Sequence, residues 1–279
     1  MPSLKQYLQR LGSRPGSPQS IDAVSSALRE GANEQKRTWK ELERLRKTLE
    51  LRFGTLQVAP PSPPGSMAGL LRRLHQQGPR FETVIDIGAS DGRWTSLAMQ
   101  SFPLQRYLLI EAQPVHDAAL RAFAQEHPNV DIIMAAAGAA LGEIYFDASD
   151  PFGGQASSIP YPTSNITVPV ISLDHEVAAR QATGPFLLKF DTHGFEMQIL
   201  AGAVETLQNT AAVIMECYNF RISPDCIPFP EMCLHMQSLG FRCVDLADVM
   251  YRERDGALWQ MDLVFVRSDR QEFQNNSYR

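Results

Sequence analysis

The stretch Val84-Ile-Asp86-Ile-Gly88-Ala-Ser90-Asp91-Gly92-Arg-Trp94 decides the fold of this chain. It is an apolar strand that runs into a small, glycine-rich turn and then into a helix. In an open α/β sheet, ligands bind beyond the carboxyl ends of the strands, where glycines let the backbone approach them and a helix N-terminus offers unpaired N–H groups. The stretch therefore predicts an α/β sheet with a ligand site at this turn.

Strand-like and helix-like segments alternate around this stretch. Such alternation predicts a mostly parallel sheet, here of seven strands, that is covered by helices on both faces. The last two strands are joined without a helix, so we expect them to pair as an antiparallel hairpin. The expected strands are 83–87, 107–111, 130–135, 186–191, 212–216, 242–246 and 262–267, and the expected helices are 94–101, 116–126, 195–207 and 229–239.

The first 58 residues differ from the rest in charge. The chain has 279 residues and a net charge of -5, but residues 1–58 hold 11 of its 26 Lys and Arg and only 6 of its 31 Asp and Glu. An apolar stripe at helical spacing runs through this charged segment. The residues of the stripe are Trp39, Leu42, Leu45, Leu49 and Phe53.

Four segments follow from these patterns. They are a helical extension at 1–58, a proline-rich linker at 59–66, a main domain at 67–270 and a polar tail at 271–279. We expect the extensions of two or more chains to associate, so that the protein forms a homo-oligomer. Packing against the main domain and docking to a partner or a membrane surface are its alternative roles.

The composition argues against several classes of protein. No apolar run reaches the roughly 18 residues of a membrane span, and the chain starts without a signal-peptide stretch, so we expect a cytoplasmic protein. The main domain is acidic and nucleic-acid phosphates bind clustered Lys and Arg, so we do not expect a nucleic-acid-binding protein. The four cysteines form no C-x-x-C pair, which favours reduced packing cysteines over a zinc or redox site.

The turn and the strand after it predict a nucleoside cofactor. The turn has the pattern D-x-G-x-x-x-G rather than the G-x-G-x-x-G of nicotinamide and flavin enzymes, which weakens a dehydrogenase interpretation. Glu111 ends the next strand, where a carboxylate can accept both ribose hydroxyls of such a cofactor. An incidental surface acid is the alternative for Glu111.

These features resemble a class I, Rossmann-like S-adenosylmethionine-dependent methyltransferase. The run Leu188-Lys-Phe-Asp191-Thr-His193-Gly-Phe-Glu196, with Ile199-Leu-Ala-Gly-Ala203, resembles the K-[IF]-D-x-x-G-x-E…[VI]-L-x-G-A signature of the FkbM methyltransferase family. The serines after Ala156, the segment 169–174 and the acidic end at Glu216 resemble further parts of that family. The resemblance covers about residues 82 to 267, and residues 1–65 lie outside it.

The resemblance implies S-adenosylmethionine as the cofactor. The N–H groups of residues 88–92 would meet its carboxylate. Glu111 with Gln113 would hold its ribose, and Ala136 and Ala137 would line its adenine pocket, with incidental loop packing as the alternative for Gln113 and the alanines. The full expected set of cofactor-binding residues is Asp86, Gly88, Ser90, Asp91, Gly92, Glu111, Gln113, Ala136 and Ala137.

The candidate catalytic residues follow two further strands. Asp191 ends the strand expected beside the cofactor strand, so its carboxylate is a candidate general base. His193 is a second candidate, with a loop histidine without a chemical role as its alternative. Glu216 ends the next strand, and Asp191 with Glu216, joined by Asn219 as a further ligand, is a candidate Mg²⁺ site. A site that uses no metal is the alternative.

Residues 147–165 are rich in Gly, Pro and Ser, and we expect a long mobile loop that closes over the site as a lid. A surface insertion is the alternative. The resemblance implies O-methylation of a sugar hydroxyl, in a polysaccharide or a glycosylated natural product. The rival interpretations are a catalytically silent module that docks a partner through residues 1–58 and a nicotinamide-dependent oxidoreductase.

Overall fold

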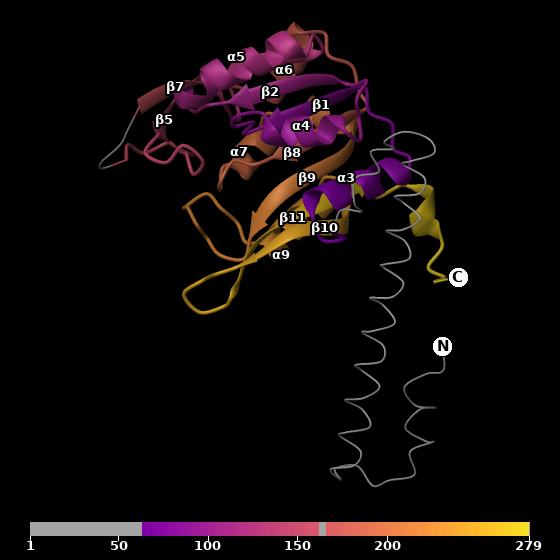
Figure 1. The fold of residues 1–279 in the computed structure, drawn as a ribbon. Coiled ribbons are helices and arrows are strands. Elements are labelled where there is room, and N and C mark those ends of the chain that lie inside the picture. Colours follow the sequence, from indigo (N-terminus) through magenta and orange to yellow (C-terminus); the bar gives the residue numbers. More distant parts are fainter. Residues whose placement is uncertain (1–62, 162–165, 279) are drawn as a thin grey trace, which may run out of the picture. The chain divides into compact units, whose positions relative to one another are not determined.

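The computed structural model describes residues 63–161 and 166–278 of the chain (Figure 1). The helical extension expected at 1–58 lies outside the described residues, as does the first part of the linker. The division of the chain into four segments therefore stays a prediction. Within the described ranges, no helix is long and apolar enough to cross a membrane.

A seven-stranded sheet forms the centre of the described region, in the order β10-β11-β9-β8-β1-β2-β3. Neighbouring strands from β9 to β3 are parallel, whereas β11 runs antiparallel to both β9 and β10. The expected sheet with its terminal antiparallel hairpin is confirmed. The strands are β1 (Thr83–Ile87), β2 (Arg106–Glu111), β3 (Val130–Met134), β8 (Phe186–Phe190), β9 (Thr210–Tyr218), β10 (Phe241–Tyr251) and β11 (Leu258–Arg267).

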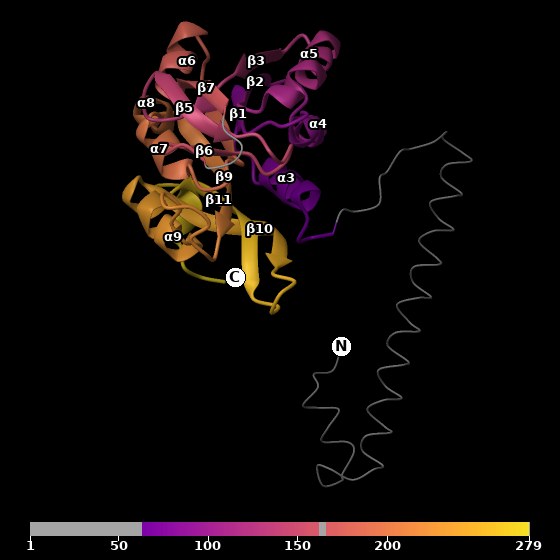
Figure 2. The same ribbon diagram turned by 90° about the vertical axis from the view of Figure 1, so that its left-hand side faces the viewer.

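Helices cover both faces of this sheet (Figure 2). Successive residues of a strand point to opposite faces, and Val84 accordingly packs with Leu70 and Leu120, while Ile85 packs with Leu200 and Met236. The first face carries α3 (Met67–Gln76), α4 (Arg93–Met99), the short η1 (Pro114–His116) and α5 (Asp117–Glu126). The second carries α6 (Leu173–Ala179), α7 (Glu196–Ala201), α8 (Val204–Gln208) and α9 (Phe229–Ser238).

Three details differ from the expected helices. The helix expected at 195–207 is divided into α7 and α8 at Gly202, where the chain presses so closely on Gly138 that a Cβ would overlap the Gly138 carbonyl oxygen. Helices α3 and α6 are not among the expected ones. The segment expected as a polar tail begins with a short 3₁₀ turn, η2 (Gln271–Gln274).

A second, four-stranded sheet lies between β3 and α6 in the chain, in the order β4-β7-β5-β6. Its side chains Ala136, Phe146, Val168 and Val170 form a small apolar core of their own. Part of the segment expected as a mobile loop is therefore strand, because β6 pairs antiparallel with β5. The strands are β4 (Ala136–Ala137), β5 (Gly142–Asp147), β6 (Gln155–Ser157) and β7 (Ile166–Ile171).

Candidate active site

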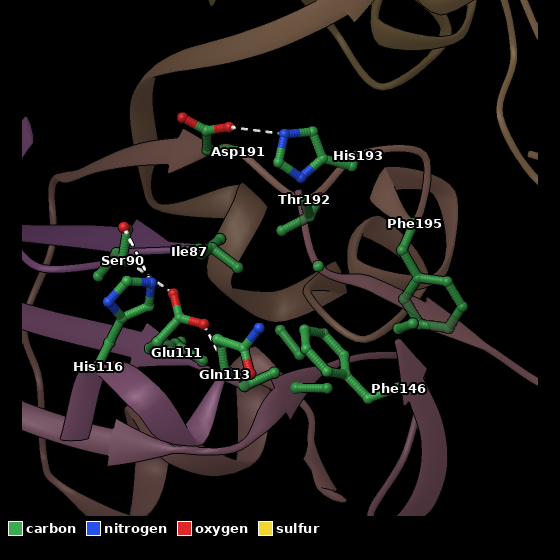
Figure 3. A pocket seen from close by; sticks show the side chains of 18 of the residues that line it. Ile87, Ser90, Glu111, Gln113, His116, Phe146, Asp191, Thr192, His193 and Phe195 are labelled. Atoms are coloured by element: carbon green, nitrogen blue, oxygen red, sulfur yellow. Dashed lines mark hydrogen bonds and ion pairs between the residues drawn. The ribbon is translucent and has the colours of Figure 1, made fainter. Parts of the chain in front are cut away.

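A pocket opens at the carboxyl ends of β1, β2 and β8 (Figure 3). The second sheet closes one side of it through Phe146 and Ala156. Asp191 and His193 lie at its opposite side. The expected cofactor residues that line the pocket are Gly88, Ser90, Glu111, Gln113, Ala136 and Ala137.

The glycine-rich turn brings β1 and β8 close together below the pocket. Gly88 has a φ of +82°, and a Cβ there would overlap the Asp191 carbonyl oxygen, so no other residue fits. Four of the five N–H groups of residues 88–92 are already engaged: those of Gly88 and Ala89 donate to Ile110 O, that of Gly92 donates to Ala89 O, and that of Ser90 donates to Glu111. A cofactor carboxylate that binds these N–H groups, as expected, would have to replace their present acceptors or share the N–H hydrogens with them.

Glu111 is held at the pocket wall by two backbone groups. Its Oε2 accepts from the Ser90 N–H and its Oε1 from the Gln113 N–H, both at 2.6 Å. Burial raises the pKa of Glu111, and the two N–H groups oppose that shift. The Ala112 N–H also lowers this pKa. A carboxylate has about four lone-pair sites, so Glu111 keeps capacity to accept from a further hydroxyl.

The loop after β5 is tied to the pocket rim by two residues that follow β2. The Gln113 side-chain amide donates to Asp150 O at 3.2 Å. His116 Nε2 lies 2.7 Å from Pro151 O, and because a carbonyl only accepts, this nitrogen carries the proton. The Phe152 ring contacts both the His116 ring and the Arg93 guanidinium. The loop thus covers one side of the pocket.

Three expected cofactor residues do not line the pocket. Asp91 forms a surface ion pair with Arg93, and Gly92 is the N-cap residue that precedes α4. Asp86 lies on the α4 side of β1, where Thr95 donates to its Oδ2 at 2.6 Å and its Oδ1 has no partner within the described ranges. Burial raises the pKa of Asp86 to about 7.

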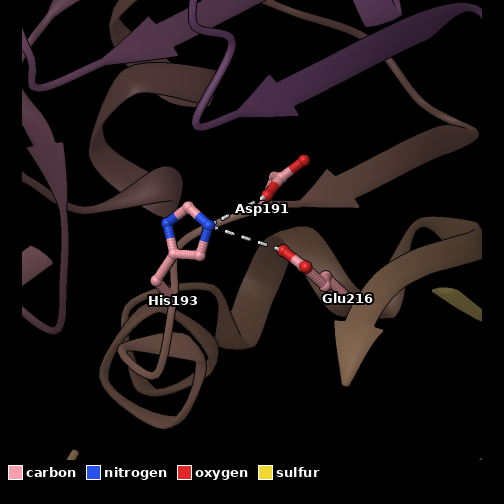
Figure 4. A group of neighbouring side chains, drawn as sticks. All are labelled: Asp191, His193 and Glu216. Carbon is pink, nitrogen blue, oxygen red and sulfur yellow. Dashed lines mark ion pairs between the residues drawn. The ribbon is translucent and has the colours of Figure 1, made fainter. Parts of the chain in front are cut away.

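Asp191, His193 and Glu216 converge at the ends of β8 and β9 (Figure 4). His193 Nε2 lies 3.9 Å from Asp191 Oδ1 and 3.7 Å from Glu216 Oε2. Glu216 is buried behind the other two and does not line the pocket. Asn219 is bound to β11, since its backbone and side-chain amides donate to Trp259 O and Leu258 O.

Lys189 lies beneath this group and is almost wholly buried. Its Nζ lies 2.9 Å from Asp262 and 3.4 Å from Asp191. Burial works to lower the pKa of Lys189, but the surrounding carboxylates outweigh it and raise that pKa. For Asp191 burial is the largest effect and works to raise the pKa, but Lys189, Glu216 and His193 together outweigh it and lower that pKa. Burial, followed by the Asp191 charge, raises the pKa of Glu216.

Comparison with known proteins decides the family. Residues 86–243 match the model of the methyltransferase FkbM domain. The chain belongs to the FkbM methyltransferase family. This FkbM methyltransferase is therefore an S-adenosylmethionine-dependent enzyme, as the turn and Glu111 led us to expect. No curated protein matches the chain.

Solved structures similar to this FkbM methyltransferase include two from Burkholderia thailandensis. An O-methyltransferase family protein is 11% identical, with a TM-score of 0.40, over 72% of this chain and 55% of its own. The 1,6-didemethyltoxoflavin-N1-methyltransferase, solved with that compound and S-adenosylhomocysteine, is 12% identical, with a TM-score of 0.42, over 92% and 93%. A precorrin-6y C5,15-methyltransferase from Geobacter metallireducens is 10% identical, with a TM-score of 0.39, over 72% and 87%.

Several residues of the FkbM methyltransferase site are not among the expected ones. Lys189 is one, although a lysine in the otherwise apolar strand FLLKF is a signal that it needs a buried partner. Glu196 is another: its Oε1 accepts from Thr192 Oγ1 and Gly194 N, which fixes the turn that carries His193. His116 and Phe146 reach the pocket only through the fold, and no local pattern marks them.

Proposed function

We propose that this FkbM methyltransferase transfers the methyl group of S-adenosylmethionine to a hydroxyl of a sugar, in a polysaccharide or a glycosylated natural product. The observation that carries the proposal is that one pocket joins the Gly88 turn and Glu111 to a pair of basic groups, Asp191 and His193. A cofactor held by the Gly88 turn and Glu111 would lie next to Asp191 and His193.

The residues present fit the cofactor. Glu111 keeps acceptor capacity for a ribose hydroxyl, and the small side chains of Ala136 and Ala137 leave room for a flat base beside Phe146. When bound, S-adenosylmethionine supplies a methyl group on a sulfonium that is transferred by in-line displacement. Such a transfer depends mainly on positioning and on exclusion of water.

The acceptor hydroxyl must lose its proton as the methyl group is transferred. Asp191 is suited to accept that proton, because Lys189 keeps its carboxylate ionised and Asp191 lines the pocket. General-base help of this kind contributes about 10²- to 10⁴-fold to the rate. His193, in the same pocket, is the second candidate for this role.

The loop after β5 acts as the lid in this proposal. Pro151, Phe152 and Gly154 line the pocket, and Gln113 and His116 hold the loop's carbonyls. Among the described residues, the loop is held at the rim by two side-chain hydrogen bonds and by the ring of Phe152, so it can open for the cofactor and close after it. The closed loop would keep water from the sulfonium.

The proposal is tested with S-adenosylmethionine labelled in its methyl group. Glycosides serve as acceptors and the matching deoxyglycosides, which lack one hydroxyl, serve as controls. The amount of labelled methyl group transferred to each acceptor is measured. We expect label in a glycoside and none in its deoxy counterpart, and we expect Asp191→Asn to lower turnover at least 100-fold while S-adenosylhomocysteine still binds. Equal labelling of both acceptors, or full turnover by the variant, would contradict the proposal.

A further inference from the structure

The group formed by Asp191, His193 and Glu216 has the spacing of a metal site. Each side chain offers one donor atom, and these atoms all lie within 4.8 Å of one another. Adjacent ligands of a divalent ion bound at about 2.1 Å lie roughly 3 to 3.5 Å apart. The contacts that His193 Nε2 makes at 3.7 and 3.9 Å are only slightly wider.

Glu216 supplies a second and independent observation. It is only 7% exposed, and its Oε2 is buried without a hydrogen-bond partner among residues 63–161 and 166–278. This oxygen faces His193 Nε2 (Figure 4). A buried carboxylate oxygen with no donor costs free energy of folding. A bound cation would satisfy it.

Two of the three side chains, Asp191 and Glu216, are fixed through atoms other than the donor atom. Asp191 is held through Oδ2 by Lys189, which leaves Oδ1. Glu216 is held through Oε1 by the Gln260 amide, which leaves Oε2. His193 lies in a left-handed turn, with a φ of +51°. Metal ligands in proteins are typically oriented by such outer partners.

The charges around the group also suit a divalent cation. Among the residues that the structure describes, Lys189 is the lysine beside the group, and Asp262 at 2.9 Å and Asp191 at 3.4 Å share its charge. Its single charge faces three carboxyl groups, those of Asp262, Asp191 and Glu216, so two negative charges remain when all three are ionised. One divalent ion balances both of them, and buried charges persist only when they are paired or bind a metal.

We propose that Asp191, His193 and Glu216 bind one divalent transition-metal ion, with Mn²⁺ as the probe, and that Asn219 is not a ligand. The imidazole nitrogen decides the metal, because Mg²⁺ prefers oxygen ligands while Mn²⁺ and the later first-row ions accept mixed nitrogen and oxygen sets. The ion's role rests on the proposed function: at the pocket's edge it would orient the acceptor hydroxyl and lower its pKa, so with the ion bound Asp191 acts as a ligand and no longer as the proton acceptor. The binding itself does not rest on it.

The test is a calorimetric titration of the full chain, stripped of metal by a chelator, with Mn²⁺ and with Mg²⁺. We expect one Mn²⁺ per chain, with Mg²⁺ at least 100-fold weaker. Glu216→Gln keeps the contact to Gln260 but loses the charge, and should weaken Mn²⁺ at least 100-fold, while the metal-free variant melts no lower than the metal-free wild type. Asn219→Ala should leave the Mn²⁺ affinity unchanged.

A spectroscopic signal identifies the ligand even if a variant folds poorly. Electron spin-echo spectra of the Mn²⁺-bound wild type should show coupling to the ¹⁴N of an imidazole, and His193→Gln should lose it. No Mn²⁺ binding, no ¹⁴N coupling, or loss of binding in Asn219→Ala would overturn the inference. S-adenosylhomocysteine is titrated into the same samples: if it binds while Mn²⁺ does not, only the metal inference fails.

Discussion

The carboxyl group of Asp86 is buried on the α4 side of β1, just before the glycine-rich turn. Burial raises its pKa from 3.8 to about 7. The folded state therefore keeps a proton that the unfolded state releases between these two values. Since the folded state binds more protons, the free energy of unfolding falls as the pH rises through this range.

The substitution Asp86→Asn removes this titration but keeps an oxygen for the Thr95 hydroxyl. We expect the free energy of unfolding of the variant, relative to the wild type, to rise by about 2 to 3 kcal/mol between pH 5 and pH 8. Urea denaturation of both proteins at the two pH values measures the difference. A constant difference would mean that Asp86 titrates near its usual pKa when folded.

Pocket residues at the ends of strands could be predicted from the sequence. Residues whose place depends on which face of a strand or helix they occupy could not. Glu111 is the last residue of β2 and Asp191 directly follows β8, so both were predictable at the pocket edge. Asp86 lies inside β1. Successive side chains of a strand point to opposite faces of the sheet, so the Asp86 side chain points to the face covered by α4 and not to the pocket. Asp91 and Gly92 lie beyond the turn, where the start of α4 turns them away from the pocket.

At the scale of the element, the turn after β1 depends on the absence of a side chain at Gly88. A Cβ there would overlap the Asp191 carbonyl, and its φ of +82° disfavours any other residue. Gly88→Ala should therefore push β1 and β8 apart at the pocket, with a loss of stability of about 2 kcal/mol or more. Thermal unfolding and S-adenosylhomocysteine titration measure the two effects.

Gly142→Ala is the matched control for this substitution. A Cβ at Gly142 meets nothing within 4 Å, so its melting temperature should stay within about 1 °C of the wild type. A Gly88→Ala protein that is as stable and binds as tightly as this control would show that the close approach to Asp191 is not needed.

Elements with a regular period were predictable, and those that depend on distant partners were not. All seven strands of the main sheet follow from apolar runs between turn residues. Strand β6 does not, because Gln155 to Ser157 become a strand only by pairing with β5. The break between α7 and α8 likewise depends on Gly138, some sixty residues away in the chain.

At the scale of the whole molecule, the stripe from Trp39 to Phe53 predicts self-association through the extension. Sedimentation equilibrium of the full chain should give more than one chain per particle. Leu45→Asp places a charge in the stripe and should return the protein to a single chain. Arg46→Ala, next to it but off the stripe, is the control and should leave the mass unchanged. A wild-type protein that sediments as a single chain would contradict the prediction.

The central claim is that the pocket beside Glu111 binds S-adenosylmethionine, and calorimetric titration with S-adenosylhomocysteine tests it most directly. We expect one molecule bound per chain, no binding of NAD, and a loss of about tenfold or more in affinity for Glu111→Gln, because hydrogen bonds to a charged group contribute about 1.5 to 3 kcal/mol. Binding of NAD alone, binding of neither ligand, or unchanged affinity in the variant would contradict the account.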